Sequence, residues 1–191
     1  MKISKGDDFG WPYTYFDHFK SKRLVAPEYG GDGKKLASNK YKDPVYGLPA
    51  HWAPNDLLFY SGDMFPERYK NGAFIAFHGS TNRSPYPQAG YVVGFIPFKD
   101  GLPSGELEIF ADGFAQVEVI KEMKDAKYRP MGLAEGPDGS IYISDSKKGK
   151  IWRVAFTADK SSFTDENLKV MELRKHLPHI KTPIEFQDIV K

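Results

Sequence analysis

The stretch YRPMGLAEGPDGSIYISDS (128–146), followed by KGKIWRVAF (148–156), decides the fold because it repeats an earlier pattern. The earlier copy consists of AHWAPNDLLFY (50–60), GAFIAFHGSTNR (72–83) and GYVVGFIPF (90–98). Each copy is typical of a strand, a turn, a second strand, a loop and a third strand. Repetition of such a unit predicts the blades of a β-propeller.

The two copies predict an ordered set of short strands. The expected strands of the first copy are residues 56–61, 73–79, 91–98 and 106–114. Those of the second copy are residues 130–136, 141–146 and 151–156. The PDGS segment between the first two strands of the second copy predicts a tight hairpin turn.

Length and composition agree with an all-β domain. The chain has 191 residues, which is enough for one domain with a hydrophobic core. Its 18 Gly and 14 Pro, together with 15% aromatic residues, favour short strands joined by turns. We therefore expect a partial β-propeller over residues 1–160 and a C-terminal helix and linker over 161–191. Thr164, followed by Asp165 and Glu166, predicts the start of that helix.

Several classes of protein are excluded or disfavoured. A net charge of only +2 without a dense basic run gives no support for nucleic acid as a partner. The absence of cysteine excludes disulfides, thiolate metal sites and a covalently attached haem. No apolar run is long enough to span a membrane, and the residues after Met1 show no signal-peptide pattern.

Polar residues converge on one rim of the expected blades. The loop that enters the first strand and the loop that leaves the second strand lie at the same end of a blade. These loops carry His51, Trp52, His78, Arg83, Lys127 and Arg129. Guanidinium groups bind planar carboxylates in bidentate fashion, and aromatic faces stack on flat rings. The rim therefore predicts a site for a planar, polyanionic ligand.

Structural roles for the same residues stay open at this point. His78 follows an apolar strand and suits a histidine with purely structural hydrogen bonds. Arg129 could pair with the carboxylate of Asp145, and Trp52 could belong to the core.

Three motifs resemble a known family. They are GDDFGWPY (6–13), the run HGSTNR (78–83) with GYVVGFIPF (90–98), and YRPMGLAEGPDGSIYISDSKKGKIWRVAF (128–156), and they resemble the PQQ-dependent sugar dehydrogenases of the L-sorbosone and soluble glucose dehydrogenase type. The resemblance implies two to three blades from the C-terminal part of a six-bladed propeller. It also implies that pyrroloquinoline quinone (PQQ) and Ca²⁺ are held on one rim, where an aldose or related polyol is oxidised.

The resemblance assigns roles to the rim residues. Arg129 matches an arginine that contacts the quinone carboxylates, and Lys127 replaces a second basic residue there. Arg83 matches another cofactor contact, with His78 beside it. The pair His51 and Trp52 lies near the segment that faces the cofactor ring.

The resemblance also places essential parts outside this chain. The family's catalytic histidine and calcium-binding loop belong to earlier blades, so we assign no catalytic residue and no metal ligand within the chain. The polypeptide alone is then expected to show no turnover. A cytochrome c electron acceptor, a periplasmic or secreted location, and self-association through open blade edges are further expectations.

Two other functions remain as alternatives. A non-catalytic propeller module could bind carbohydrate or protein through the same rim. A lactonase-like hydrolase would use metal-bound water, but carboxylates on the rim are scarce, chiefly Asp145.

Overall fold

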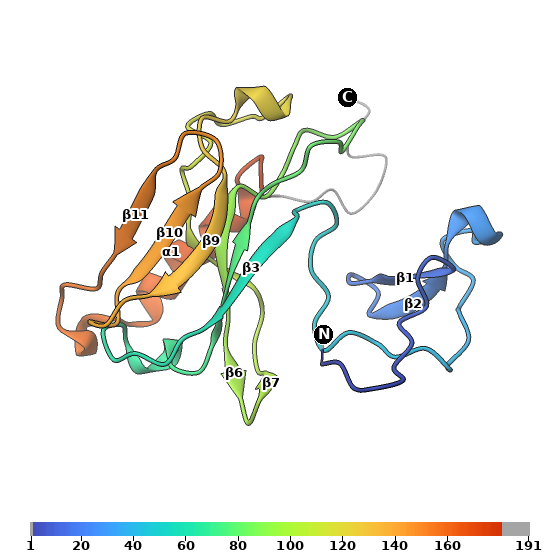
Figure 1. The fold of residues 1–191 in the computed structure, drawn as a ribbon, viewed down its shortest axis with the longest axis horizontal. Helices are drawn as coiled ribbons and strands as arrows, with labels where there is room; N and C mark the ends of the chain where they lie inside the picture. Colours follow the sequence, from blue (N-terminus) through green and yellow to red (C-terminus); the bar gives the residue numbers. More distant parts are fainter. Residues whose placement is uncertain (1, 181–191) are drawn as a thin grey trace. The chain divides into compact units, whose positions relative to one another are not determined.

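A computed structural model describes residues 2–180 of the chain as a set of small β-sheets (Figure 1). The chain divides into two compact units, residues 1–49 and residues 50–191. Within the described residues, no helix combines the length and apolar character needed to cross a membrane.

The first unit contains a β-hairpin held by one arginine. Strand β1 (Thr14–Asp17) pairs antiparallel with β2 (Lys22–Val25). Arg23 of β2 donates hydrogen bonds to the carbonyl of Phe9 at 2.7 Å and to that of Lys42 at 2.6 Å. Its guanidinium therefore ties the segments before and after the hairpin to the hairpin itself.

The second unit begins with a four-stranded antiparallel sheet in the order β3-β4-β5-β8. The strands are β3 (Pro54–Phe59), β4 (Ala73–Phe77), β5 (Val92–Ile96) and β8 (Glu108–Ala111). All residues of β4 and β5 are buried, because these central strands are covered on both faces. A small hairpin, β6 (Phe98–Lys99) and β7 (Leu102–Pro103), projects between β5 and β8.

A three-stranded antiparallel sheet follows in the order β11-β10-β9. Its strands are β9 (Pro130–Glu135), β10 (Ile141–Asp145) and β11 (Ile151–Val154). The turn between β9 and β10 has Gly139 at φ +80°, a conformation that favours glycine, and confirms the predicted PDGS turn.

Side chains join the two larger sheets. Asp56 of β3 accepts a hydrogen bond from the backbone N–H of Leu133 in β9 at 2.7 Å. The carboxylate of Glu135, also in β9, accepts from the backbone N–H of Ser61 at 2.8 Å. Strands β3 and β9 therefore lie side by side although they belong to different sheets.

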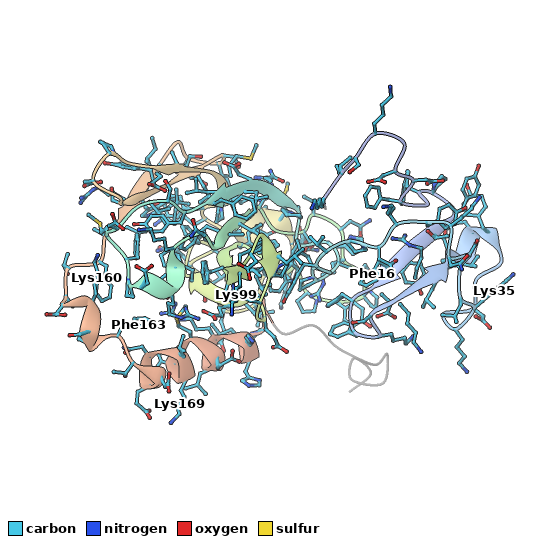
Figure 2. All side chains as sticks on the ribbon, turned by 90° about the horizontal axis from the view of Figure 1, so that it is seen from below. Phe16, Lys35, Lys99, Lys160, Phe163 and Lys169 are labelled. Carbon is cyan, nitrogen blue, oxygen red and sulfur yellow. The ribbon has the colours of Figure 1, made fainter. Side chains whose placement is uncertain are left out.

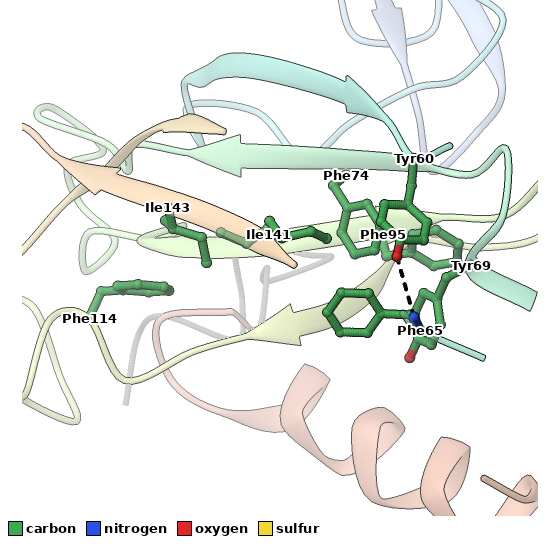
Figure 3. Close-up of a cluster of buried hydrophobic side chains, with 9 residues drawn as sticks. Tyr60, Phe65, Tyr69, Phe74, Phe95, Phe114, Ile141 and Ile143 are labelled. Atoms are coloured by element: carbon green, nitrogen blue, oxygen red, sulfur yellow. Dashed lines mark hydrogen bonds between the residues drawn. The ribbon is translucent and has the colours of Figure 1, made fainter. Parts of the chain in front are cut away.

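The core of the second unit is largely aromatic (Figure 3). Its buried members are Tyr60, Phe65, Tyr69, Phe74, Val93, Phe95, Phe114, Ile141 and Ile143. The hydroxyl of Tyr60 donates to the carbonyl of Gly139 at 2.7 Å and accepts from the backbone N–H groups of Met64 at 3.0 Å and Phe65 at 3.3 Å. This one hydroxyl therefore satisfies three backbone groups and links the β9–β10 turn to the four-stranded sheet.

A paired arginine extends this core. The guanidinium of Arg68 forms a bidentate pair with Glu108, at 2.9 Å and 2.5 Å. It also lies over the rings of Tyr69, Phe95 and Phe163, within 5.0 to 5.8 Å of their centroids. The pair is mostly shielded from water and connects the loop after β3 to strand β8.

The predicted C-terminal helix is present as α1 (Asp165–Leu173), with Thr164 as its N-cap. Asn167 accepts a hydrogen bond from the backbone N–H of Thr164 at 2.8 Å, which satisfies one free donor at the helix start. Figure 2 shows Lys169 reaching outward from α1, and Phe163 at the turn that precedes it. The short 3-10 helices are η1 (Pro27–Tyr29), η2 (Glu67–Tyr69), η3 (Met123–Asp125), η4 (Lys160–Ser162) and η5 (Arg174–His176). Most of the expected linker lies outside the described residues.

The expected partial six-bladed propeller is wrong. The described residues form separate sheets of two, three, four and two strands, none of them closed and none arranged as propeller blades. The two larger sheets share one aromatic core and are tied together through β3 and β9. Between β8 and β9 the chain forms loops and η3 in place of a further strand. The strands of the two larger sheets were therefore predicted correctly, and their assembly was not.

Candidate functional site

Arg129 is a buried arginine at the start of β9, with only 6% of its surface exposed. Its Nε donates to the carbonyl of His78 at 3.0 Å, and its Nη2 donates to the carbonyl of Gly79 at 2.7 Å. The guanidinium also lies over the ring of Tyr91, 5.4 Å from the centroid. Three segments distant in the sequence therefore meet at this side chain.

The carboxylate of Asp145 does not form an ion pair with the guanidinium of Arg129, although the sequence left that pairing open. Its Oδ1 accepts the backbone N–H of Arg129 at 2.6 Å, and its Oδ2 accepts the backbone N–H of Lys148. Burial raises the pKa of Asp145, but the backbone hydrogen bonds outweigh burial and leave the pKa below its usual value. The carboxylate therefore holds the β10–β11 turn, and its partners are backbone amides.

Arg83 is the second buried arginine, with 7% of its surface exposed. It lies on the loop 80–90, where its Nη1 donates to the carbonyl of Pro87 at 3.0 Å and its guanidinium lies 5.5 Å from the ring centroid of Tyr86. Within residues 2–180, neither Arg83 nor Arg129 has a carboxylate within salt-bridge distance. Burial lowers the pKa of both guanidinium groups, yet an arginine remains charged at neutral pH.

His78 stands beside Arg129 at the end of β4. Its Nε2 and the hydroxyl of Ser146 are 2.7 Å apart. Burial lowers the pKa of His78, the charge of Arg129 lowers it further, and Asp145 opposes both. The imidazole is therefore mostly neutral at pH 7 and can exchange hydrogen bonds with a ligand or with Ser146.

The loop 80–90 is built on two glycines and a tyrosine. Gly79 and Gly90 both have φ of +89°, and a Cβ atom on Gly79 would lie 2.4 Å from the ring of Tyr91. The hydroxyl of Tyr91 donates to the carbonyl of Ser80 at 2.5 Å. We call the group formed by His78, Tyr91 and Arg129, together with Arg83 on the adjoining loop 80–90, the arginine site.

The three remaining predicted residues differ in burial: Trp52 is buried, whereas His51 and Lys127 are exposed. Trp52 is buried, packs edge-to-face on Phe77 at 5.1 Å and receives the backbone N–H of Gly79 on its carbonyl. Its indole N–H has no hydrogen-bond partner among the described residues. His51 is exposed, with a φ of +63°. Lys127 is also exposed, and its ammonium lies 3.3 Å from Oε1 of Gln116.

The structure thus joins His78 and Arg129 directly and places Arg83 on the adjoining loop. Trp52 supports that loop through its backbone. Lys127 instead contacts Gln116, and His51 extends into solvent, so neither side chain joins the arginine site. Tyr91 and the direct contact of Ser146 with His78 were missed by sequence reasoning. A glycine just before an aromatic residue at the end of a loop was the available signal for Tyr91.

Among residues 2–180, no group of three or more His, Asp and Glu side chains could hold a metal ion.

Comparison with known proteins identifies the family. The sequence model of a family described as TrAA12-like matches residues 19–157. The chain belongs to the TrAA12-like family. The match covers the strands of both larger sheets and every residue of the arginine site.

Solved structures support the fold of this TrAA12-like chain. Two structures of Trichoderma reesei Carbohydrate-Active Enzymes Family AA12, described as a calcium and an iodide structure, match with TM-scores of 0.54 and 0.53. Each is 21% identical and covers 76% of this chain and 38% of the other. A Borreliella burgdorferi protein named "Uncharacterized protein" is 33% identical over 151 residues, which are 78% of this chain and 36% of that protein. The chain therefore spans little more than a third of the length of these relatives.

The resemblance to L-sorbosone and soluble glucose dehydrogenases is corrected by this finding. The motifs quoted for it fall largely within the stretch that matches the TrAA12-like family. They are dominated by strand ends, Gly-Pro loops and the Asp138–Gly139 turn, which report backbone geometry more than family membership.

Proposed function

We propose that this TrAA12-like chain is part of a carbohydrate-active oxidoreductase that oxidises a sugar with PQQ, and that the arginine site binds the cofactor's carboxylates. One observation carries the proposal: two buried guanidinium groups have no carboxylate partner within the described residues. Buried charges are normally paired. An anionic ligand would supply the missing partner.

The donor set fits a planar polycarboxylate. Arg129 uses Nε and Nη2 for backbone carbonyls, and Arg83 uses Nη1, so each has further N–H donors to offer a ligand. The neutral imidazole of His78 adds a hydrogen-bonding group beside Arg129. When bound, PQQ supplies the capacity to accept two electrons from a sugar. The residues of this chain would bind and orient it.

The family adds independent support. The matched solved structures are of a carbohydrate-active enzyme family, which is consistent with a sugar as substrate. The periplasmic or secreted location and the cytochrome c acceptor remain predictions. We assign no residue of this chain to contact with the sugar or to removal of its proton.

Titration of the purified chain with PQQ, followed by tryptophan fluorescence or calorimetry, tests the proposal. We expect Arg129→Gln and Arg83→Gln each to weaken binding by about tenfold or more, because each removes a charged donor to a carboxylate. Arg129→Lys retains the charge and should lose less. Circular dichroism checks that each variant is folded.

Arg153→Gln is the matched control, because Arg153 is a half-exposed arginine of β11 that pairs with Asp138, away from the arginine site. It should bind as the unmodified chain does. Failure of the unmodified chain to bind PQQ, or equal binding by all variants, would overturn the proposal. Binding of neutral sugars without PQQ would favour a non-catalytic carbohydrate-binding module.

A further inference from the structure

His179 lies in a short C-terminal segment that packs against the loop 80–90 of the arginine site. Its backbone carbonyl accepts the N–H of Gly90 at 2.9 Å. Gly90 is the last residue of that loop, next to Tyr91, and a Cβ added to it would lie 3.0 Å from Cα of Gly79. The segment therefore contacts the loop at the point where it closes on itself.

The side chain of His179 is fixed from both ring nitrogens. Its Nε2 lies 2.8 Å from Oδ1 of Asp112, and its Nδ1 lies 3.3 Å from the backbone carbonyl of Glu118. Both neighbours are acceptors, so only the doubly protonated ring satisfies both contacts. The histidine is only 6% exposed, so its ring nitrogens have little access to water as an alternative hydrogen-bond partner.

Residues 112–120, which contact the ring of His179, also contact the loop 80–90. The backbone N–H of Gln88 donates to the carbonyl of Ile120 at 2.8 Å. A buried apolar cluster joins this stretch to the end of the loop; its members are Tyr91, Ala115, Ile120 and Ala126. Asp112, Glu118 and Ile120 thus belong to one stretch that contacts both the loop 80–90 and His179.

We propose that His179 is a positioning residue, which in its protonated form clamps the loop 80–90 and so orders Arg83 and Tyr91 for binding an anion. The proposal rests on the proposed function only for the identity of the anion. The clamp itself is a property of the protein without ligand. No role in touching substrate or cofactor is assigned to His179.

The expected pH dependence follows from the pair. Burial lowers the pKa of His179, but the contact with Asp112 outweighs burial and raises the pKa above its ordinary value of 6.5. The stabilisation is therefore complete below pH 6.5 and is lost as the pH rises through the raised pKa. Burial raises the pKa of Asp112, but the hydrogen bond from His179 outweighs it and the pKa is lowered, so acid weakens the clamp only below 3.8. Arg174 is the other charged group that acts on Asp112, and it stays protonated throughout.

Hydrogen exchange of the amides in residues 80–90 tests the clamp without any ligand. Protection factors, which correct for the intrinsic pH dependence of exchange, should be about tenfold lower at about pH 8.5 than at about pH 5.5. His179→Gln should show the lower protection at both pH values. Asp112→Asn, which keeps the shape of the side chain, should also remove the pH dependence.

His176→Gln is the matched control, because His176 is an exposed histidine three residues earlier in the same segment. It should retain the pH dependence of the unmodified chain. Equal protection of the loop in His179→Gln and the unmodified chain would overturn the clamp. The affinity for PQQ, measured separately, should fall in His179→Gln. A clamp that responds as expected in a chain that never binds PQQ would overturn the proposed ligand and leave the positioning role in place.

Discussion

Two guanidinium groups are withdrawn from solvent in the second unit without a carboxylate against them among the described residues. Arg129 uses two donors on the carbonyls of His78 and Gly79, and Arg83 uses one on Pro87. Each therefore braces a loop and still keeps donors for a ligand. The position of the Arg129 guanidinium depends on the shape of the loop as well as on charge, because Gly79 supplies a carbonyl that Arg129 binds.

Gly79→Ala should therefore be strongly destabilising. The substitution places a Cβ at φ +89° and 2.4 Å from the ring of Tyr91, so backbone strain and overpacking add. We expect the free energy of unfolding to fall by about 3 kcal/mol, measured by urea denaturation.

Gly101→Ala separates the two causes. Gly101 has a φ of +76°, and a Cβ added there would meet no atom within 4 Å, so only the backbone strain applies. A loss of about 1 kcal/mol is expected there. Equal losses at the two positions would show that the contact with Tyr91 contributes nothing.

The residues of the site were predictable, but their partners were not. His78, Arg83 and Arg129 stand out because charged and imidazole groups follow apolar strands. The sequence does not show that Asp145 would bind backbone amides and leave the guanidinium of Arg129 without a carboxylate, since both arrangements satisfy the same residue types. Tyr91 also resembles an ordinary core aromatic until the φ values of Gly79 and Gly90 are known.

At the scale of elements, short loops and turns carry the ion pairs that connect strands. Arg68 and Glu108 join the loop before β4 to β8, with the guanidinium lying over three aromatic rings. Arg153 and Asp138 form a comparable pair on β11, but both side chains are about half exposed. Burial is therefore the main difference between the two pairs.

Arg68→Ala should destabilise the chain far more than Arg153→Ala. The first change leaves the carboxylate of Glu108, which is 13% exposed, without its partner, and we expect a loss of about 3 kcal/mol. The second removes an exposed pair and should cost about 0 to 1 kcal/mol. Chemical denaturation of both variants at one salt concentration makes the comparison. Similar losses would mean that the shielding of Arg68 has no energetic consequence.

The strands of the two larger sheets and the C-terminal helix were well predicted from local patterns. The apolar runs at 73–79 and 91–98 form β4 and β5, and the turn at Asp138–Gly139 has the expected conformation. Thr164 caps α1 as its neighbours predicted. These features depend on a few adjacent residues, which is the information that a single sequence contains.

At the scale of the whole chain, the second unit is organised by a shared core instead of repeated blades. Tyr60, at the end of β3, reaches the β9–β10 turn through the carbonyl of Gly139, a contact between residues 79 positions apart. The two sheets were predicted separately, but no local pattern shows that β3 and β9 lie side by side. The propeller expectation failed at this step.

Tyr60→Phe should reveal the energetic role of that contact. The change keeps the ring in the core but leaves the buried groups of Gly139 and Phe65, and the partly buried N–H of Met64, without their partner. We expect the free energy of unfolding to fall by about 1 to 3 kcal/mol. Thermal or urea unfolding measures it, with Tyr13→Phe as the control because the ring of Tyr13 is largely exposed. A change no larger than that of the control would show that the hydroxyl is dispensable.

The close approach of Gly79 and Gly90 at the two ends of the loop carries an evolutionary consequence. A Cβ added to Gly90 would lie 3.0 Å from Cα of Gly79, and a Cβ added to Gly79 would lie 2.4 Å from the ring of Tyr91, so a side chain at either position would be crowded by the opposite end of the loop. Homologues should therefore show correlated substitution at the two positions: glycine at both when the loop keeps its length, and departures from glycine accompanied by insertions or deletions between them.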